Sequence, residues 1–168
     1  MNAMISSKVE NAIDNFPLFE DLDDETRDLL KSQAKLKAFV AGQKLTTEGD
    51  ETKDVYLLTR GEVEVRSHVS DGEVILAKLG AGHIVGEVSA AMGVPRTSTV
   101  TALDLVEVVL IPATLISEVM ESNPQLKSLI LETVHQRAID AMQRVPKSGT
   151  RLSVDVEMPW DTPEAEEE

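Results

Sequence analysis

The sequence contains no cysteine, one tryptophan, one tyrosine and three phenylalanines among its 168 residues. The absence of cysteine excludes disulfides, thiolate catalysis and cysteine-ligated zinc. Because aromatic residues are scarce, aliphatic side chains must build the core, and an apolar content of 42% is sufficient for one. Basic residues are also few, with 16 against 30 acidic residues and a formal charge of −14. This balance argues against a protein that mainly grips nucleic acid or an anionic membrane, because either needs a positive field.

Long hydrophobic runs are missing as well. The longest apolar stretches fall far short of the ~20 residues of a membrane span. The N-terminus also lacks the apolar centre of a secretory signal. We therefore expect a soluble, cytoplasmic chain that forms one domain.

The C-terminal stretch differs from the rest of the chain in composition. Residues 146–168 hold three of the seven prolines, two of the 16 basic residues and seven of the 30 acidic residues. We interpret them as a mobile acidic tail after a domain at 14–145, with residues 1–13 as a lead-in. Within the tail, apolar and polar residues alternate, as in an extended segment or in a short strand that docks elsewhere. The apolar members are Val154, Val156, Met158 and Trp160.

Between residues 36 and 111, short apolar stretches alternate with turns that contain glycine, which is typical of antiparallel strands. Asp71-Gly72 is the signal of a tight hairpin. Val63 and Val65 alternate with charged neighbours, as half-buried strands do. The expected strands are 36–40, 55–59, 62–68, 74–79, 97–102 and 105–111.

Helical periodicity flanks this strand region on both sides. One helix is expected at 23–34, with Asp23 or Asp24 as its N-cap, and two more at 113–121 and from Pro124 to about Val145. The sequence thus predicts a mainly β fold, an antiparallel β-roll with an N-terminal helix and a C-terminal helix pair.

Residues 85–100, VGEVSAAMGVPRTSTV, interrupt the strand pattern. Gly86 precedes a helical turn, where free backbone N–H groups can receive an anion. Arg96 can fold back and offer its planar guanidinium to the same anion. Glu87 would repel an anion, so it fits only beside a neutral donor such as a ribose hydroxyl. A nucleotide monophosphate ester would need this pattern, and the alternative is a surface loop in which Glu87 and Arg96 pair with each other.

From Gly86 to Ala102, without a gap, the chain resembles the phosphate-binding cassette of the cyclic nucleotide-binding domain. We call residues 85–100 the cassette. The resemblance extends over about 14–145 and implies a jelly-roll-like, double-stranded β-helix. Val85 departs from the family, which usually has an aromatic residue there. Further matches in the family's order are Asn15-Phe16-Pro17-Leu18-Phe19, Gly42, Glu48-Gly49-Asp50, Val55-Tyr56-Leu57-Leu58, Gly61-Glu62-Val63 and Leu79-Gly80-Ala81-Gly82.

The resemblance implies that Arg96 pairs with the equatorial oxygens of a cyclic phosphate and that Glu87 accepts from the ribose 2′-hydroxyl. A hydroxyl directly after the arginine, here Thr97, is associated in the family with guanine, although many bacterial members with one resemble cAMP sensors. We favour cAMP and keep cGMP as the alternative. We also expect Arg96 of the free protein to lie in a water-filled pocket. The other implied ligand-binding residues are Gly86, Val88, Ser89, Thr97 and Ser98.

In the family the last helix closes over the base, which makes Ala141 and Met142 the implied base cap. Neither side chain supplies an adenine-specific contact. Apolar residues recur along this helix at spacings of three and four, which indicates either packing on the β-roll or a homodimer interface. They are Leu131, Val134, Ala138, Ala141 and Val145.

These observations predict a stand-alone regulatory module, not an enzyme, that binds a cyclic nucleotide and signals through its C-terminal helix to an unidentified effector protein. No metal or further cofactor is expected. The same fold used as a ligand-free interaction scaffold is the main alternative. A DNA-binding regulator would need a recognition helix and a basic patch, which residues 146–168 lack. A cupin-like enzyme would need clustered metal ligands, whereas His68, His83 and His135 are isolated.

Overall fold

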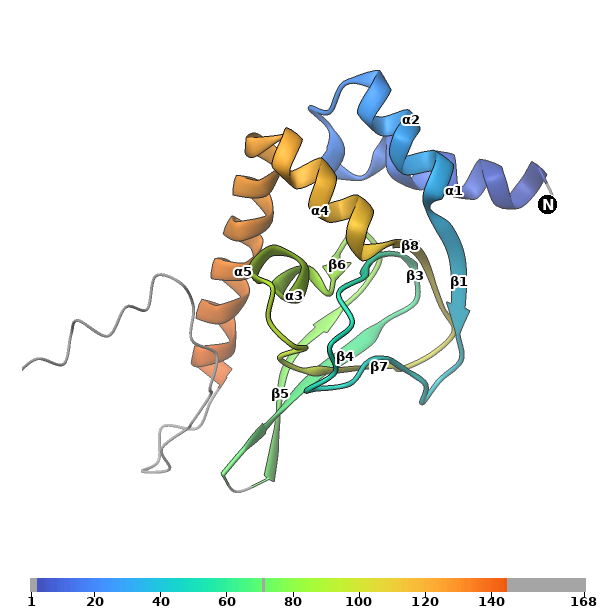
Figure 1. Ribbon diagram of the computed structural model, residues 1–168. Helices are drawn as coiled ribbons and strands as arrows, with labels where there is room; N and C mark the ends of the chain where they lie inside the picture. Colours follow the sequence, from blue (N-terminus) through green and yellow to red (C-terminus); the bar gives the residue numbers. More distant parts are fainter. Residues whose placement is uncertain (1–2, 71, 145–168) are drawn as a thin grey trace, which may run out of the picture.

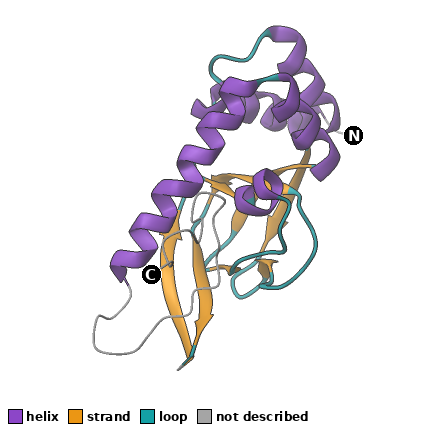
Figure 2. Cartoon of the chain, turned by 60° about the vertical axis from the view of Figure 1, so that its left-hand side comes forward, coloured by secondary structure: helices purple, strands orange, loops and turns teal. Residues whose placement is uncertain are grey.

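The computed structural model describes residues 3–70 and 72–144 (Figure 1). In this part of the chain, eight strands form two four-stranded sheets, and all paired strands are antiparallel. Helices gather at one end of the strands, and the long last helix runs down one side of them (Figures 1 and 2). The predicted β-roll with flanking helices is confirmed. The alternating tail segment that ends at Trp160 lies outside the described residues.

The two sheets draw their strands from distant parts of the sequence. The first has the order β1 (Lys35–Phe39), β8 (Val106–Ile111), β3 (Val55–Arg60) and β6 (Ile84–Val85). The second has the order β2 (Lys44–Thr46), β7 (Thr99–Ala102), β4 (Val63–Val69) and β5 (Gly72–Leu79). The sequence did not reveal β2, because a strand of three residues is too short to show a period.

Strand β3 separates two hydrophobic cores, which explains its uninterrupted apolar run. Val55 and Leu57 face a core shared with the helices, whereas Tyr56 and Leu58 face a second core inside the roll. Successive side chains of a strand point to opposite faces, so a strand buried on both sides reads as apolar throughout. Its partner β8 alternates in the same way, and Leu57 pairs with Val109.

The N-terminal helices are α1 (Ala3–Asn15), the 3₁₀ helix η1 (Pro17–Phe19) and α2 (Asp24–Gln33). Helix α2 begins as predicted, because the Asp23 carboxylate accepts from the Thr26 N–H at 2.8 Å. We did not expect α1. It begins in the segment assigned as a lead-in and extends to Asn15, and its Val9 and Ile13 are buried in the core shared with the helices.

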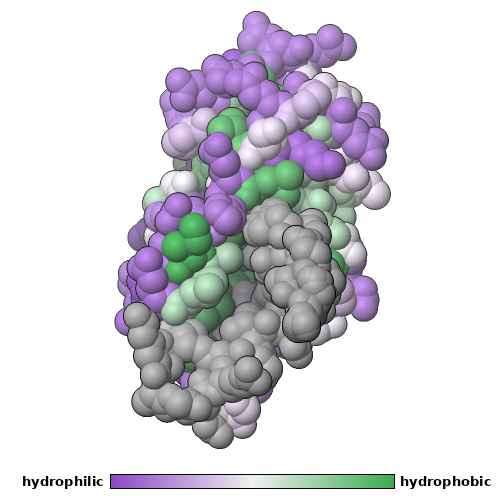
Figure 3. Space-filling model, turned by 90° about the vertical axis from the view of Figure 1, so that its left-hand side faces the viewer, coloured by the Kyte–Doolittle hydropathy of each residue, from purple (hydrophilic) through white to green (hydrophobic). Residues whose placement is uncertain are grey.

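The C-terminal helices are α4 (Ala113–Ser122) and α5 (Pro124–Arg144), close to the predicted bounds. Helix α5 contacts β5 and the cassette helix α3 (Glu87–Met92). Val134 on α5 is buried, and Leu131, Ala138 and Ala141 are half-buried. The described part of the predicted stripe is thus at least half-buried on a helix that contacts the roll at β5. On the face of the molecule where α5 lies, hydrophilic side chains dominate the upper part (Figure 3). A homodimer through α5 stays a prediction.

Candidate functional site

The cassette is built around α3, which is framed by two glycines. Gly86 before the helix has φ +90° and Gly93 after it has φ +68°, both in the left-handed region. A side chain at Gly86 would also collide with its surroundings. Its Cβ would lie 2.6 Å from the Asp54 carbonyl oxygen and 2.7 Å from Nη1 of Arg96. Glycine is therefore needed here both for the turn and for the close approach of the arginine.

The Arg96 side chain is buried, at 4% exposure, and all three guanidinium nitrogens donate hydrogen bonds. Nη2 donates to the Asp54 carbonyl at 2.8 Å and Nη1 to the Gly86 carbonyl at 3.3 Å. Nε donates to the Thr52 hydroxyl at 3.2 Å. The expectation of a water-filled pocket around this side chain is wrong, because the side chain is buried and two backbone carbonyls and a hydroxyl already accept its hydrogen bonds.

Every one of these three acceptors is neutral. Burial lowers the pKa of the Arg96 guanidinium, since desolvation penalises the charged form, although nearby Asp54, Asp50 and Glu87 oppose the shift. An arginine nevertheless keeps its proton in a protein. The site therefore holds a buried positive charge that forms no ion pair within residues 3–70 and 72–144. An unpaired buried cation is the electrostatic requirement of an anion site.

Glu87 opens α3 and is also buried, at 2% exposure. Its Oε2 accepts from Nη1 of Arg137 on α5 at 2.5 Å. The alternative in which Glu87 and Arg96 pair with each other is thus not what the structure shows. Oε1 of Glu87 takes no hydrogen bond from the described residues.

The C-terminal limb of the cassette, residues 96–99, follows the arginine into β7. The Arg96 carbonyl accepts from the Gly49 N–H at 2.8 Å. The Thr97 carbonyl accepts from the Ser67 hydroxyl at 2.7 Å, and the Ser98 carbonyl accepts from the Thr46 hydroxyl at 3.2 Å. Three successive carbonyls are thereby fixed by three different parts of the roll.

The structure brings most of the predicted site residues together on α3 and the limb. Gly86, Glu87, Val88 and Ser89 form the start of α3, and Glu87 and Ser89 are buried. Thr97 and Ser98 are half-buried beside Arg96. In the predicted base cap, Ala141 is half-buried but Met142 is 70% exposed, so the described contacts do not bring Met142 to the cassette.

Sequence reasoning missed Arg137, Thr52, Asp54, Ser67 and Thr46. For Arg137 there was a signal, because it lies three and four residues from Val134 and Ala141, on the apolar face of a helix expected to close over the base. The other four lie on β2, β4 and the loop before β3, 30 or more residues from their cassette partners, and no local pattern marks them.

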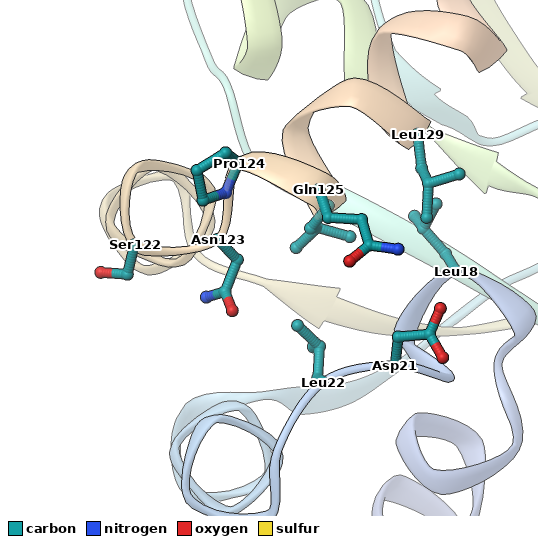
Figure 4. Close-up of a pocket in the computed structure, with 9 residues that line it drawn as sticks. Leu18, Asp21, Leu22, Ser122, Asn123, Pro124, Gln125 and Leu129 are labelled. Atoms are coloured by element: carbon teal, nitrogen blue, oxygen red, sulfur yellow. The ribbon is translucent and has the colours of Figure 1, made fainter.

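A cavity of about 180 Å³ lies away from the cassette, where α4 meets α5 (Figure 4). Leu18, Leu22 and Leu129 line it together with polar groups such as Asp21 and Asn123. None of its lining residues is basic, so it is unsuited to a phosphate.

Within residues 3–70 and 72–144, no group of three His, Asp or Glu side chains is arranged to hold a metal ion. No helix in the same ranges is both long and apolar enough to cross a bilayer.

Comparison with known proteins identifies this architecture. The family model of the cyclic nucleotide-binding domain matches residues 36–123. The chain belongs to this family. The match includes the whole cassette and every strand except the first residue of β1.

Three relatives illustrate the similarity. A cAMP-dependent protein kinase regulatory subunit of Mycosarcoma maydis is 28% identical over 93 residues, which are 55% of this chain and 18% of the relative. A cyclic nucleotide-binding domain from Methylobacillus flagellatus is 27% identical, with a TM-score of 0.66, over 83% of this chain and 82% of that one. The regulatory domain of Toxoplasma gondii protein kinase A, crystallised with cAMP, shares the fold at 15% identity and a TM-score of 0.72, over 80% of this chain and 51% of that one. The chain thus matches only about a fifth of the length of the Mycosarcoma maydis kinase subunit.

Proposed function

We propose that the chain is a regulatory module that binds a 3′,5′-cyclic purine mononucleotide at the cassette, with cAMP favoured and cGMP as the alternative. Occupancy changes the position of α5, and an effector protein detects that position. The observation that carries the proposal is the buried guanidinium of Arg96, whose three hydrogen-bond acceptors are all neutral.

A cyclic phosphate matches this site in charge and shape. Its single negative charge compensates Arg96, and its two free oxygens suit a planar guanidinium that donates in parallel. Such contacts require Arg96 to exchange part of its bonding to the Gly86 and Asp54 carbonyls for bonds to the phosphate. The exchange is favourable because hydrogen bonds between charged groups are stronger than those to neutral carbonyls.

Glu87 supports a ribose beside the phosphate. A free carboxylate oxygen accepts from a ribose hydroxyl, and Oε1 takes no hydrogen bond from the described residues. The other oxygen is bonded to Arg137, so a ligand that contacts Glu87 also acts on α5. A two-state position of α5 that responds to the ligand follows from this link, because a ligand shifts the equilibrium toward the state it binds more tightly.

The experiment is a calorimetric titration of the whole chain with cAMP, cGMP and cyclic di-GMP, joined to thermal melting. A ligand at 100 times its Kd raises stability by ~2.7 kcal/mol. Arg96→Lys keeps the charge but loses the planar fork, and we expect affinity to fall by about thirtyfold or more. Melting of the free variant establishes that it is folded. If no cyclic nucleotide at millimolar concentration changes heat or melting temperature, the ligand-free scaffold is the correct function.

A further inference from the structure

We infer that Ser67 and Thr46 are positioning residues, which hold the C-terminal limb of the cassette in the one conformation that can receive an anion. This inference rests on the proposed function, since the anion is the cyclic phosphate. Neither residue belongs to the cassette. Both reach it from the roll, Ser67 from β4 and Thr46 from β2.

Both hydroxyls are buried, and the alternation of apolar and polar residues along the strands does not explain a polar side chain at these positions. Ser67 is 4% exposed and Thr46 is 6% exposed. Ser67 follows Val63 and Val65 on the inward face of β4, a face that otherwise packs in the apolar core of the roll. Burying a hydroxyl is unfavourable unless it forms a hydrogen bond. Each hydroxyl satisfies this condition by donating to one carbonyl of the limb.

The two hydroxyls bond to carbonyls that lie beyond the end of the sheet ladder. The ladder between β4 and β7 ends at the pair Arg66 and Thr99. The strand predicted from residue 97 therefore begins only at Thr99, and the Thr97 and Ser98 carbonyls lie beyond the regular ladder. Side-chain hydroxyls replace ladder bonds for these two carbonyls, which keeps the chain close to the roll without continuing the strand.

Fixing a carbonyl also fixes the next amide. In a trans peptide the C=O and the following N–H point in opposite directions, and no peptide bond in the described residues is cis. Ser67 thus fixes the direction of the Ser98 N–H, and the Gly49 N–H fixes that of Thr97 through the Arg96 carbonyl. Neither the Thr97 nor the Ser98 N–H has an acceptor among the described residues. Oriented, unpaired amides beside a guanidinium are a preorganised anion cradle.

Loss of a hydroxyl should therefore weaken binding through preorganisation. Without the hydroxyl, the carbonyl and its peptide plane are no longer fixed. The limb must then be ordered when the anion binds, and the entropy lost in this ordering lowers the affinity. Removal of one neutral hydrogen bond corresponds to a loss of about three- to tenfold.

The test compares variants that remove each hydroxyl with variants that keep it. Thr46→Val and Ser67→Ala should weaken cyclic nucleotide binding by about three- to tenfold, whereas Thr46→Ser and Ser67→Thr should stay within about twofold of the parent chain. Thr59→Val is the matched control, because Thr59 on β3 donates to the Glu107 carbonyl at 3.0 Å, between strands of the other sheet. This control should lower stability and leave affinity unchanged.

Amide NMR of the free protein provides a readout that does not depend on the ligand. The Thr97 and Ser98 amides should give single sharp signals in the parent chain and shifted or broadened signals in Ser67→Ala, but unchanged signals in Thr59→Val. If no cyclic nucleotide binds to the parent chain, the proposed function fails, and these signals alone decide the positioning role. Unchanged amides in Ser67→Ala, or affinity losses equal to those of Thr59→Val, would overturn the inference.

Discussion

Arg137 on α5 donates to the carboxylate of Glu87 on α3, and this ion pair joins two residues 50 positions apart in the sequence. The Glu87 side chain is 3% exposed and that of Arg137 is 24% exposed. The pair thus differs from a surface salt bridge, in which solvent screens both charges. It connects the cassette to the helix that is expected to move.

Arg137→Met should destabilise the free protein. The change leaves the Glu87 carboxylate buried without its cation, and breaking a buried pair in this way costs about 3 kcal/mol, less to the extent that Arg137 is solvated. Urea unfolding measures the loss. The double variant with Glu87→Gln should recover most of the stability, because no buried charge then lacks a partner. A neutral single variant would show that the pair contributes nothing to closing α5 on the cassette.

Gly86→Ala should be far more damaging than Gly93→Ala. Both glycines flank α3 with positive φ, so each substitution incurs the strain of a left-handed alanine, about 1–2 kcal/mol. At Gly93 nothing lies within 4 Å of the added Cβ, whereas at Gly86 the Asp54 carbonyl and the Arg96 guanidinium lie within 3 Å. We expect Gly86→Ala to lose at least about 2 kcal/mol more than Gly93→Ala in urea unfolding. Equal losses would mean that the arginine adjusts freely.

The cassette was predictable because its chemistry is local in sequence. Gly86, Glu87 and Arg96 lie within eleven positions, and the turn, the carboxylate and the guanidinium each have a recognisable role there. The strands were predictable where they are long and alternate, as in β4, or bounded by glycine turns, as in β5.

What the sequence did not reveal depends on long-range contacts. The burial of Arg96 arises because the loop before β3 supplies the Thr52 hydroxyl and the Asp54 carbonyl, more than 40 residues away. Backbone carbonyls carry no signature in a sequence, so an open pocket was the natural but wrong expectation. Helix α1 was missed although Ile5, Val9 and Ile13 recur at the four-residue spacing of a helix, because the family resemblance begins near residue 14 and the segment before it was interpreted as a lead-in.

The stability of the domain should depend on the charge of His68. Nδ1 of His68 lies 2.8 Å from Oε1 of Glu48, and a hydrogen bond to this carboxylate raises the His68 pKa, with Glu73 adding to the effect. A raised pKa in the folded state gives a stabilising contribution that is complete below the unfolded value, near 6.5, and is lost as the pH rises through the folded value.

Melting of the parent chain and of Glu48→Gln at pH 6 and pH 8 checks this contribution. Glutamine keeps an oxygen that can accept from the His68 backbone N–H, a bond of 3.1 Å in the structure, but it removes the negative charge. The fall in melting temperature from pH 6 to pH 8 should be smaller in Glu48→Gln. Glu73 also faces Arg66. The charge of Arg66 is the same in the parent chain and in Glu48→Gln, so its effect cancels in the comparison. Identical pH profiles would contradict the assignment.

Asp54 contacts Arg96 and helix α4 with different atoms, so its two roles can be separated. Its backbone carbonyl accepts from Arg96, whereas its carboxylate accepts from the Ala113 N–H at 2.8 Å and caps α4, which Pro112 at the N-cap cannot do. Asp54→Ala should therefore cost about 0.5–2 kcal/mol in urea unfolding, and Asp54→Asn less, because the amide oxygen can still accept. Cyclic nucleotide affinity should stay within about threefold in both, since the backbone carbonyl remains. A tenfold loss of affinity in Asp54→Ala with unchanged stability would show instead that the carboxylate acts on the site itself.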